Sequence, residues 1–252
     1  MDDAVALLLI ALAGMTMSSL VDRRSAPARR SRAAWYRPGF AVPVVLMTLG
    51  IASFAVIAED VLEREPRELV LRLDRQARAS ARLVQATPGV RPAAEAVSHL
   101  TGEGLGFVVT LAAGALFVSG RRRDALVLLL GTLGAWGLSG LLKLAFAVPR
   151  PYASETTYAI TRYGFPSGHA VVATTACGLV AWLAGRRAPA SLRVLLWTAV
   201  GGLVVVTAAA RVILNAHWLS DVVGGMGIGV AWLGLVMLVA SPAGTARAEA
   251  PP

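Results

Sequence analysis

The sequence predicts an all-α membrane protein, because its composition, its long uncharged stretches and the placement of its arginines all favour that fold class. Apolar residues (AVILMFWYC) make up 56% of the 252 residues and charged residues 15%, whereas soluble proteins average roughly 45–50% and 25%. A water-soluble globule of this size cannot bury so much apolar side chain, and disordered chains have the opposite bias. The composition therefore excludes both classes.

Seven apolar stretches follow one another along the chain. A helix needs about 17–25 apolar residues to cross a bilayer core of about 30 Å. Stretches that meet or approach this length are Ala4–Leu20, Ala41–Ala58, Gly104–Gly120, Ala125–Leu142, Gly168–Gly185, Val194–Ala210 and Trp218–Ala240. The carboxylate and imidazole side chains inside them are those of His169 and Asp221. Polar groups at such positions are expensive, so both are candidates for function.

The first stretch, Ala4–Leu20, has two interpretations. Its acidic start argues against a signal peptide, and the arginine-rich segment after it favours a seventh span. Its 17 residues are the lower limit for spanning, so a helix lying in the interface stays open. The chain is accordingly divided into a hydrophobic segment with an arginine-rich cytoplasmic linker (1–39), a transmembrane domain (40–240) and a disordered tail (241–252).

The arginines predict the orientation. Arginine-rich connections occur at Val21–Gly39, Arg121–Arg123 and Arg186–Arg193. These connections alternate so that they share one side, which the positive-inside rule assigns to the cytoplasm. The connections 59–103, 143–167 and 211–217 then face outward. Heavy use of Ala, Gly and Arg suggests a bacterial source, so the predicted location is the bacterial cytoplasmic (inner) membrane.

The long outer connection contains an amphipathic pattern. After Pro66, apolar residues from Leu69 to Val84 recur at helical spacing, and arginines lie on the opposite side. The pattern predicts a helix that either rests on the outer membrane surface or packs against the protein. The turn residues of Thr87-Pro88-Gly89 end it.

The first of three polar clusters on the outer side consists of Lys143 and Arg150. Lys143 ends the fourth apolar stretch, and the prolines at 149 and 151 stop any helix from continuing. Lysine offers a compact positive charge, and arginine offers a planar fork that matches the oxygens of a phosphate. Taken alone, basic residues at the end of a span are more often interfacial anchors.

The second cluster is Pro166-Ser167-Gly168-His169, directly before a long apolar helix. Ser167 is placed to cap that helix, and Gly168 lets a ligand approach the backbone closely. Free N–H groups and the dipole at a helix start favour anions, and His169 would donate a proton to what is bound there. The alternative is a capped helix with an interfacial histidine.

The third cluster is Arg211, His217 and Asp221. His217 and Asp221 are four residues apart at the start of the last span, so they are predicted to share one helix face. The carboxylate would fix the imidazole tautomer and leave one ring nitrogen free to attack. The alternative is a self-satisfied pair within a helix bundle. His99, the third histidine of the chain, is interpreted as a surface residue.

Together the clusters match the needs of phosphoryl transfer. Lys143, Arg150 and Arg211 neutralise a phosphate, while His217 and His169 supply a nucleophile and an acid.

These motifs resemble the three-part signature of the type 2 phosphatidic acid phosphatase (PAP2) superfamily, which also includes vanadium haloperoxidases. The resemblance implies a six-helix transmembrane core over about Ala41–Ala240. It implies that His217 forms a phosphohistidine, that Asp221 orients it and that His169 protonates the leaving oxygen. The residues that would hold the phosphate are Lys143, Arg150, Ser167, Gly168 and Arg211. No metal and no cofactor are expected. Ala210 departs from the family pattern, which usually has serine before the arginine.

The expected function is therefore hydrolysis of a lipid phosphate or diphosphate of the polyprenyl diphosphate, phosphatidic acid or phosphatidylglycerol phosphate class. The expected partners are the bilayer and a membrane lipid, without nucleic acid; the oligomeric state is not readable from the sequence. Three alternatives stay open: a phosphotransferase with the same intermediate, a non-catalytic lipid-phosphate binder or carrier, and a vanadate-dependent oxidase.

Overall fold

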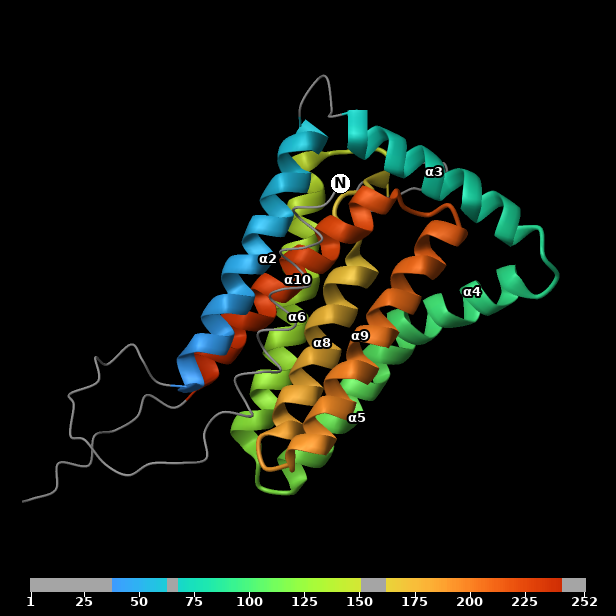
Figure 1. Cartoon of the computed structure of the whole chain (residues 1–252). Helices are drawn as coiled ribbons and strands as arrows, with labels where there is room; N and C mark the ends of the chain where they lie inside the picture. Colours follow the sequence, from blue (N-terminus) through green and yellow to red (C-terminus); the bar gives the residue numbers. More distant parts are fainter. Residues whose placement is uncertain (1–37, 63–67, 151–161, 242–252) are drawn as a thin grey trace, which may run out of the picture. The chain divides into compact units, whose positions relative to one another are not determined.

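The computed structural model describes residues 38–62, 68–150 and 162–241, and regular structure in this part of the chain is helical (Figure 1). The helices are α2 (Pro38–Leu62), α3 (Glu68–Gln85), α4 (Val90–His99), the π-helical turn η1 (Leu100–Gly104), α5 (Leu105–Val118), α6 (Arg122–Phe146), α8 (Gly168–Gly185), α9 (Ala190–Ile213) and α10 (Leu219–Ala240). The predicted all-α class is confirmed. The predicted N-terminal helix, nearly all of its linker and the tail after Ser241 lie outside the described residues.

Six helices among the described residues are long and apolar enough to cross a membrane. They correspond to the last six predicted stretches, and all of these except Gly104–Gly120 agree with the structure to within about four residues at each end. The prediction for Gly104–Gly120 was too short, because α4, η1 and α5 form one helical run from Val90 to Val118. Charged residues in its first half, including Arg91 and Glu95, lower the hydropathy there, so the first half does not stand out as an apolar stretch in the sequence.

The centre of the bundle is formed by α8 and α10. Two-thirds of the apolar window of α8 and half of that of α10 are buried, against 11% for α2 and for α9. The backbones of α2 and α10 lie so close that a Cβ at Gly50 would be 2.3 Å from the Ala231 nitrogen, which only glycine avoids. The outer helices expose large apolar side chains such as Val45, Phe107 and Val205, as expected of surfaces that face lipid.

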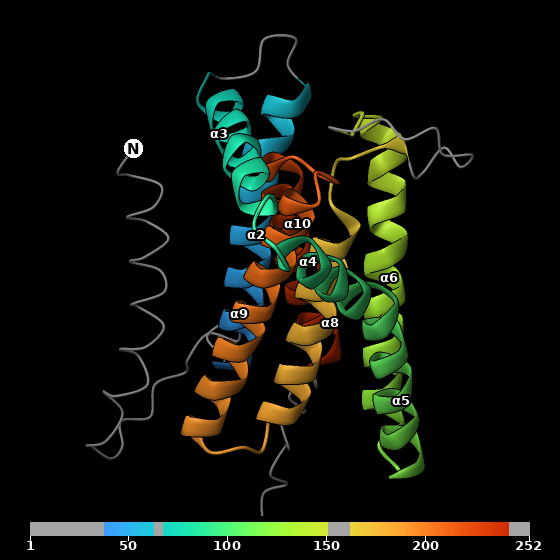
Figure 2. The same ribbon diagram turned by 90° about the vertical axis from the view of Figure 1, so that its right-hand side faces the viewer.

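The amphipathic helix α3 lies across one end of the bundle (Figure 1; Figure 2 shows it turned by 90°). Asp74 accepts hydrogen bonds from the Ser220 backbone N–H at 2.8 Å and from its hydroxyl at 2.7 Å, and Arg78 stacks over the ring of Trp218. Burial raises the pKa of Asp74. The structure therefore favours the second interpretation of this helix, in which it packs against the protein, while Leu69 and Leu73 stay exposed.

The opposite end of the bundle collects the short arginine-rich connections. Asp124 at the start of α6 pairs with Arg121 and with Arg186, and Arg123 donates to the Ala240 carbonyl at the end of α10. The candidate site residues all lie at the other end. The predicted separation of the arginine-rich turns from the polar clusters is thus present in the fold.

Candidate active site

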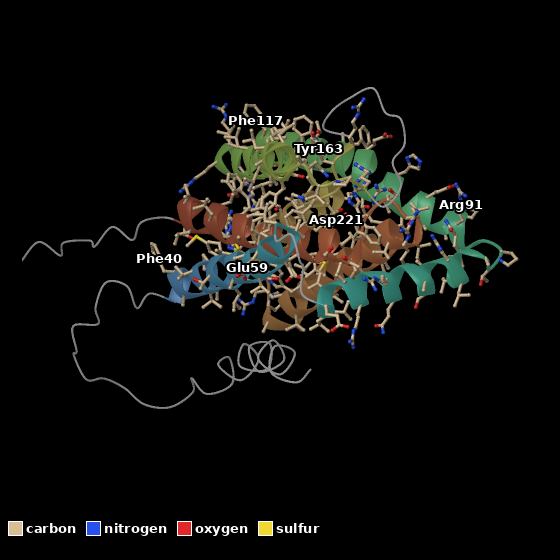
Figure 3. The ribbon with its side chains drawn as sticks, turned by 90° about the horizontal axis from the view of Figure 1, so that it is seen from above. Phe40, Glu59, Arg91, Phe117, Tyr163 and Asp221 are labelled. Atoms are coloured by element: carbon tan, nitrogen blue, oxygen red, sulfur yellow. The ribbon has the colours of Figure 1, made fainter. Side chains whose placement is uncertain are left out.

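The three polar clusters, distant in the chain, converge at one end of the bundle. Lys143 comes from the last turn of α6 and His169 from the first turn of α8. Arg211 comes from the last turn of α9, and Asp221 from the first turn of α10. Seen from above, Asp221 lies in the interior, between the helices (Figure 3). Each of these four helices ends or begins in this region, so the backbone groups and side chains of its terminal turn lie close to those of the others.

The buried pair at the centre of the site is His217 with Asp221. Nδ1 of His217 lies 3.2 Å from Oδ2 of Asp221, and the two residues are 3% and 1% exposed. Burial first, and then the positive charges of the site, lower the pKa of His217 well below its usual value. The ring is therefore neutral, and a proton on Nδ1 shared with the carboxylate leaves Nε2 with a free lone pair.

The predicted reason for this pairing was wrong in one respect. His217 does not lie on the last helix, since α10 begins at Leu219 with Trp218 as its N-cap. Asp221, the third residue of the helix, accepts the Trp218 N–H at 2.9 Å, as a capping carboxylate does. The same oxygen faces His217. The pair thus forms because a helix-capping carboxylate turns back toward the preceding loop, and not because both residues share a helical face.

Three cations border this pair. Lys143 is 6% exposed, and its Nζ donates to the carbonyls of Tyr163 at 2.9 Å and Gly164 at 3.1 Å. Arg150 and Arg211 lie within electrostatic reach of Lys143 and of each other. Burial lowers the pKa of Arg150, because its guanidinium has lost part of its hydration. Like charges held together away from water favour an anionic ligand.

Several donors in this region are left without a partner. Among the described residues, no hydrogen bond is made by the buried Nε atoms of Arg150 and Arg211 or by the buried hydroxyl of Ser167. Buried polar atoms are nearly always paired in native proteins. Three unpaired donors from three segments therefore mark a position for an acceptor-rich ligand such as phosphate.

Ser167 lies at the N-cap of α8 as predicted, but its side chain makes no capping hydrogen bond. Its backbone N–H instead donates to the Asp221 carbonyl at 2.9 Å, which ties the start of α8 to the start of α10. The hydroxyl and the free N–H groups of the first turn of α8, from Gly168 and His169, remain available to an anion.

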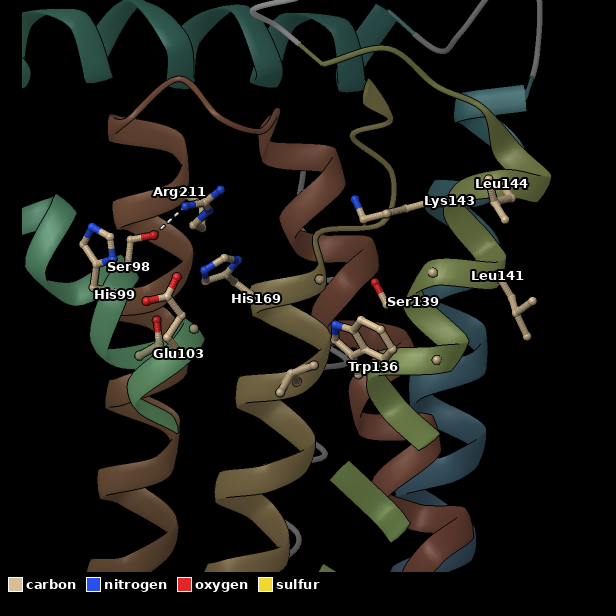
Figure 4. A pocket seen from close by; sticks show the side chains of 16 residues that line it. Ser98, His99, Glu103, Trp136, Ser139, Leu141, Lys143, Leu144, His169 and Arg211 are labelled. Atoms are coloured by element: carbon tan, nitrogen blue, oxygen red, sulfur yellow. Dashed lines mark hydrogen bonds between the residues drawn. The ribbon is translucent and has the colours of Figure 1, made fainter. Parts of the chain in front are cut away.

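A cavity of about 730 Å³ opens beside these groups (Figure 4). Of the predicted residues, Lys143, Gly168, His169 and Arg211 line it. The other four do not line it: Ser167, His217 and Asp221 are buried, and Arg150 is half-buried. The His217 ring is nonetheless within electrostatic reach of His169. The structure therefore brings all eight predicted residues into one region, and four of them line the cavity.

Sequence reasoning missed the wall of the cavity that α4 and η1 contribute. Ser98 accepts a hydrogen bond from Nη1 of Arg211, and its backbone hydrogen-bonds the ring of His169. His99 is exposed, as predicted, but it lies at the cavity with Glu103. The sequence signal that would have found this wall is weak, since these residues belong to no chemical motif. No group of three potential metal ligands occurs in the described part of the chain.

Gly164 offers a test of this geometry, because a Cβ there would be 2.8 Å from Oδ2 of Asp221. Gly164→Ala is expected to displace the carboxylate and lower kcat by about 100-fold, since small misplacements of catalytic groups have effects of that size. Phosphate release by purified protein measures it. Gly201→Ala is the matched control, because a Cβ at Gly201 meets no atom within 4 Å. Equal rates for both variants would show that Asp221 does not need its present position.

Comparisons with known proteins identify relatives of this chain. A family model described as the PAP2 superfamily matches residues 124–244. Decaprenylphosphoryl-5-phosphoribose phosphatase of Mycolicibacterium smegmatis is 33% identical over 141 residues, which cover 55% of this chain and 72% of the relative. The protein of the same name from Mycobacterium tuberculosis is 30% identical and covers 56% and 76%.

The fold also has a solved counterpart. A transmembrane PAP2 type phosphatidylglycerolphosphate phosphatase from Bacillus subtilis superposes with a TM-score of 0.65 at 23% identity, over 77% of this chain and 94% of that one. The fold of this chain is thus shared with that protein at low sequence identity. The sequence relatives and the matched domain together establish the family: the chain belongs to the PAP2 superfamily.

Proposed function

We propose that this multi-pass membrane enzyme, a PAP2-type lipid phosphatase, removes a terminal phosphate by transferring it to His217 and then to water. The observation that carries the proposal is the buried His217 ring, which lies against Asp221 and next to three cations. A binder or carrier would need the cations but would gain nothing from an oriented imidazole. The pair therefore favours an enzyme over the non-catalytic alternative.

In the first step, Nε2 of His217 attacks phosphorus and the bond from phosphorus to the ester oxygen breaks. The electron pair of that bond goes to the leaving oxygen, which takes a proton from His169. The oxygens of the transferring group face Lys143, Arg150 and Arg211, and the Ser167 hydroxyl and the N–H groups that begin α8 complete the set of donors. Asp221 balances the charge that develops on the nucleophilic ring.

In the second step, water attacks the phosphohistidine. The N–P bond breaks, inorganic phosphate leaves, and the neutral His169 accepts the proton of the water, so that both histidines return to their initial states. Transfer to an alcohol in place of water would share the first step, and product analysis distinguishes the two reactions. Charge neutralisation by the three cations replaces what metal ions supply in other phosphoryl-transfer sites.

The walls of the cavity support a lipid substrate. Trp136 and Leu141 of α6 line the cavity and are 71% and 68% exposed, so the cavity is continuous with a surface that faces lipid. A tail can stay in the bilayer while the phosphate reaches His169. The relatives are named for a decaprenylphosphoryl phosphoribose and for phosphatidylglycerol phosphate, which are both lipid phosphates.

The arginine-rich turns support an outward-facing site. Arg121–Arg123 and Arg186 lie at the end of the bundle opposite Lys143 and Asp221, and positive loops face the cytoplasm. We therefore place the reaction at the periplasmic or extracellular face of the cytoplasmic membrane of a bacterium.

Orthovanadate is expected to inhibit competitively, because it occupies the same donors in the geometry of pentavalent phosphorus, whereas EDTA is expected to leave the rate unchanged. Phosphate release from phosphatidic acid or phosphatidylglycerol phosphate in detergent measures both. Arg211→Ala should weaken vanadate inhibition about tenfold or more, since hydrogen bonds from charged groups have effects of that size. Arg193→Ala, at the opposite end of the bundle, is the matched control. A rate that EDTA removes and Mg²⁺ restores would contradict the metal-free mechanism.

A further inference from the structure

The segment α4–η1 is held against the catalytic groups by three contacts. The Ser98 hydroxyl accepts from Arg211, and the Ser98 backbone hydrogen-bonds the ring of His169. At Gly102 the backbone comes so close that an added Cβ would be 2.8 Å from Nε2 of His169. A π-helical turn of this kind is rare and often occurs at functional sites. This segment also precedes residue 124, where the match to the family domain begins.

This placement makes η1 a wall for the leaving group. In the proposed mechanism the leaving oxygen takes its proton from His169, so it must come within hydrogen-bonding distance of that ring. The part of the substrate next to this oxygen then lies in the cavity beside Gly102 and its neighbour Glu103, which both line it. A cavity of about 730 Å³ is within the range that holds a whole small-molecule ligand, so it has room for more than a phosphate.

Glu103 brings a carboxylate to this wall (Figure 4). The side chain is exposed, and within the described ranges it takes part in no hydrogen bond or ion pair. An ionised carboxylate only accepts hydrogen bonds, so its suitable partners on a neutral headgroup are hydroxyl groups. A second phosphate at the same position would meet a like charge.

The wall opposite differs in chemistry. Trp136, Leu141 and Leu144 of α6 give it an apolar surface, and Gly137 and Gly140 have no other atoms near their missing Cβ positions. The cavity thus offers cations to the phosphate, a carboxylate to the headgroup and an apolar face to the tail.

We propose that Glu103 binds hydroxyl groups of the leaving group, and that the enzyme therefore prefers phosphate monoesters of lipids with a sugar or polyol headgroup over lipid diphosphates. The proposal rests on the proposed function and narrows its substrate class. The specificity residue lies on α4–η1, outside the part of the chain that carries the catalytic motifs.

The test compares wild-type protein, Glu103→Ala and Glu103→Gln on four substrates in detergent. Two carry hydroxyl groups next to the phosphate ester: a polyprenylphosphoryl pentose phosphate and phosphatidylglycerol phosphate. Two do not: phosphatidic acid, and a polyprenyl diphosphate, whose second phosphate is bonded directly to the phosphoryl group that is transferred. The measured quantity is kcat/KM for phosphate release. Glu95→Ala is the matched control, because Glu95 lies on the same helical run, pairs with Arg91 and is absent from the cavity lining.

Glu103→Ala is expected to lower kcat/KM for the hydroxyl-bearing substrates about tenfold or more, the effect of losing a hydrogen bond to a charged group. The variant should leave kcat/KM for phosphatidic acid within about twofold of the wild-type value. It should raise kcat/KM for the diphosphate, since the repulsion between the carboxylate and the second phosphate is gone. Glu103→Gln keeps an acceptor oxygen, so it should retain more activity than Glu103→Ala on hydroxyl-bearing lipids. It should still raise kcat/KM for the diphosphate. The substrate that loses more kcat/KM in Glu103→Ala, the pentose phosphate or the glycerol phosphate, is the one whose headgroup the carboxylate binds.

The outcomes separate the two proposals. A wild-type protein that hydrolyses none of the four lipids would contradict the proposed function. A wild-type protein that hydrolyses them, with Glu103→Ala and Glu103→Gln changing all four equally or none, would overturn the role of Glu103 alone. Unchanged vanadate inhibition in both variants would show that the phosphate site is intact and that any change in preference arises at the headgroup.

Discussion

Replacement of His217 by alanine is expected to abolish phosphate release, with a loss of about 10⁴-fold or more, because removing the nucleophile of a concerted site removes most of its catalysis. Of the other two imidazoles, His169 lies within electrostatic reach of His217 but is committed to proton transfer in the proposed mechanism, and His99 is an exposed residue of the cavity wall. The measurement is phosphate release from a lipid phosphate, together with acid- or alkali-quenched trapping of ³²P on the protein.

Wild-type protein should carry label that survives alkali and is lost in acid, as expected for a phosphohistidine, and His217→Ala should carry none. His217→Gln, which keeps a polar side chain of similar length, controls for the hole that alanine leaves next to Asp221. Both variants should melt within a few degrees of the wild type and still bind orthovanadate through the cations. Label on either variant, or turnover near that of the wild type, would show that another residue attacks phosphorus.

His169→Ala is expected to slow the first turnover on a lipid phosphate by about 10²–10⁴-fold, the usual contribution of a general acid. The deficit should depend on the leaving group, because an alkoxide needs a proton and a nitrophenolate does not. With p-nitrophenyl phosphate, the first equivalent of nitrophenolate should therefore appear at nearly the wild-type rate. The second step lacks its base, so a burst and an accumulated phosphoenzyme are expected. Stopped-flow absorbance and ³²P trapping measure them.

The control for this experiment is Gly164→Ala, in which the carboxylate behind His217 is disturbed and His169 is left in place. That variant should slow the first turnover with both substrates to a similar degree and accumulate no phosphoenzyme, since its defect lies in the attack itself. Equal losses on the two substrates for His169→Ala would mean that His169 positions the phosphate and does not protonate the leaving group.

Most of the transmembrane fold follows from local properties of the chain. Hydropathy finds α6, α8, α9 and α10 because each contains an apolar window of 18 residues. The polar clusters at Lys143, Ser167 and Arg211 were predictable because each interrupts a helix at a membrane boundary, where alternation of the spans brings them to one side. The residue types of the three clusters suggest a shared phosphate ligand, and the structure brings the clusters together.

The remaining features depend on long-range contacts, which no local pattern reports. In the sequence, Gly102 belongs to a connection and has no evident role. In the structure its lack of a Cβ matters, because the ring of His169 lies against it. Ser98 has no motif, and its role in holding Arg211 comes from the path of α4 across α9. The start of α10 was predicted one residue too early and His217 was wrongly placed on the helix, because Trp218 and Asp221 cap the helix before Leu219.

The contact of Asp74 with Ser220 bears on how small a working catalyst can be. All eight candidate side chains lie within residues 143–221, and thus inside the stretch that defines the family domain. Yet the loop that carries the nucleophile is secured from outside that stretch, by α3 through Asp74, and the neighbouring guanidinium is secured by α4 through Ser98. The minimal working unit of this enzyme is therefore expected to be larger than the stretch that carries its motifs, because α3 and α4 hold groups of the site in place.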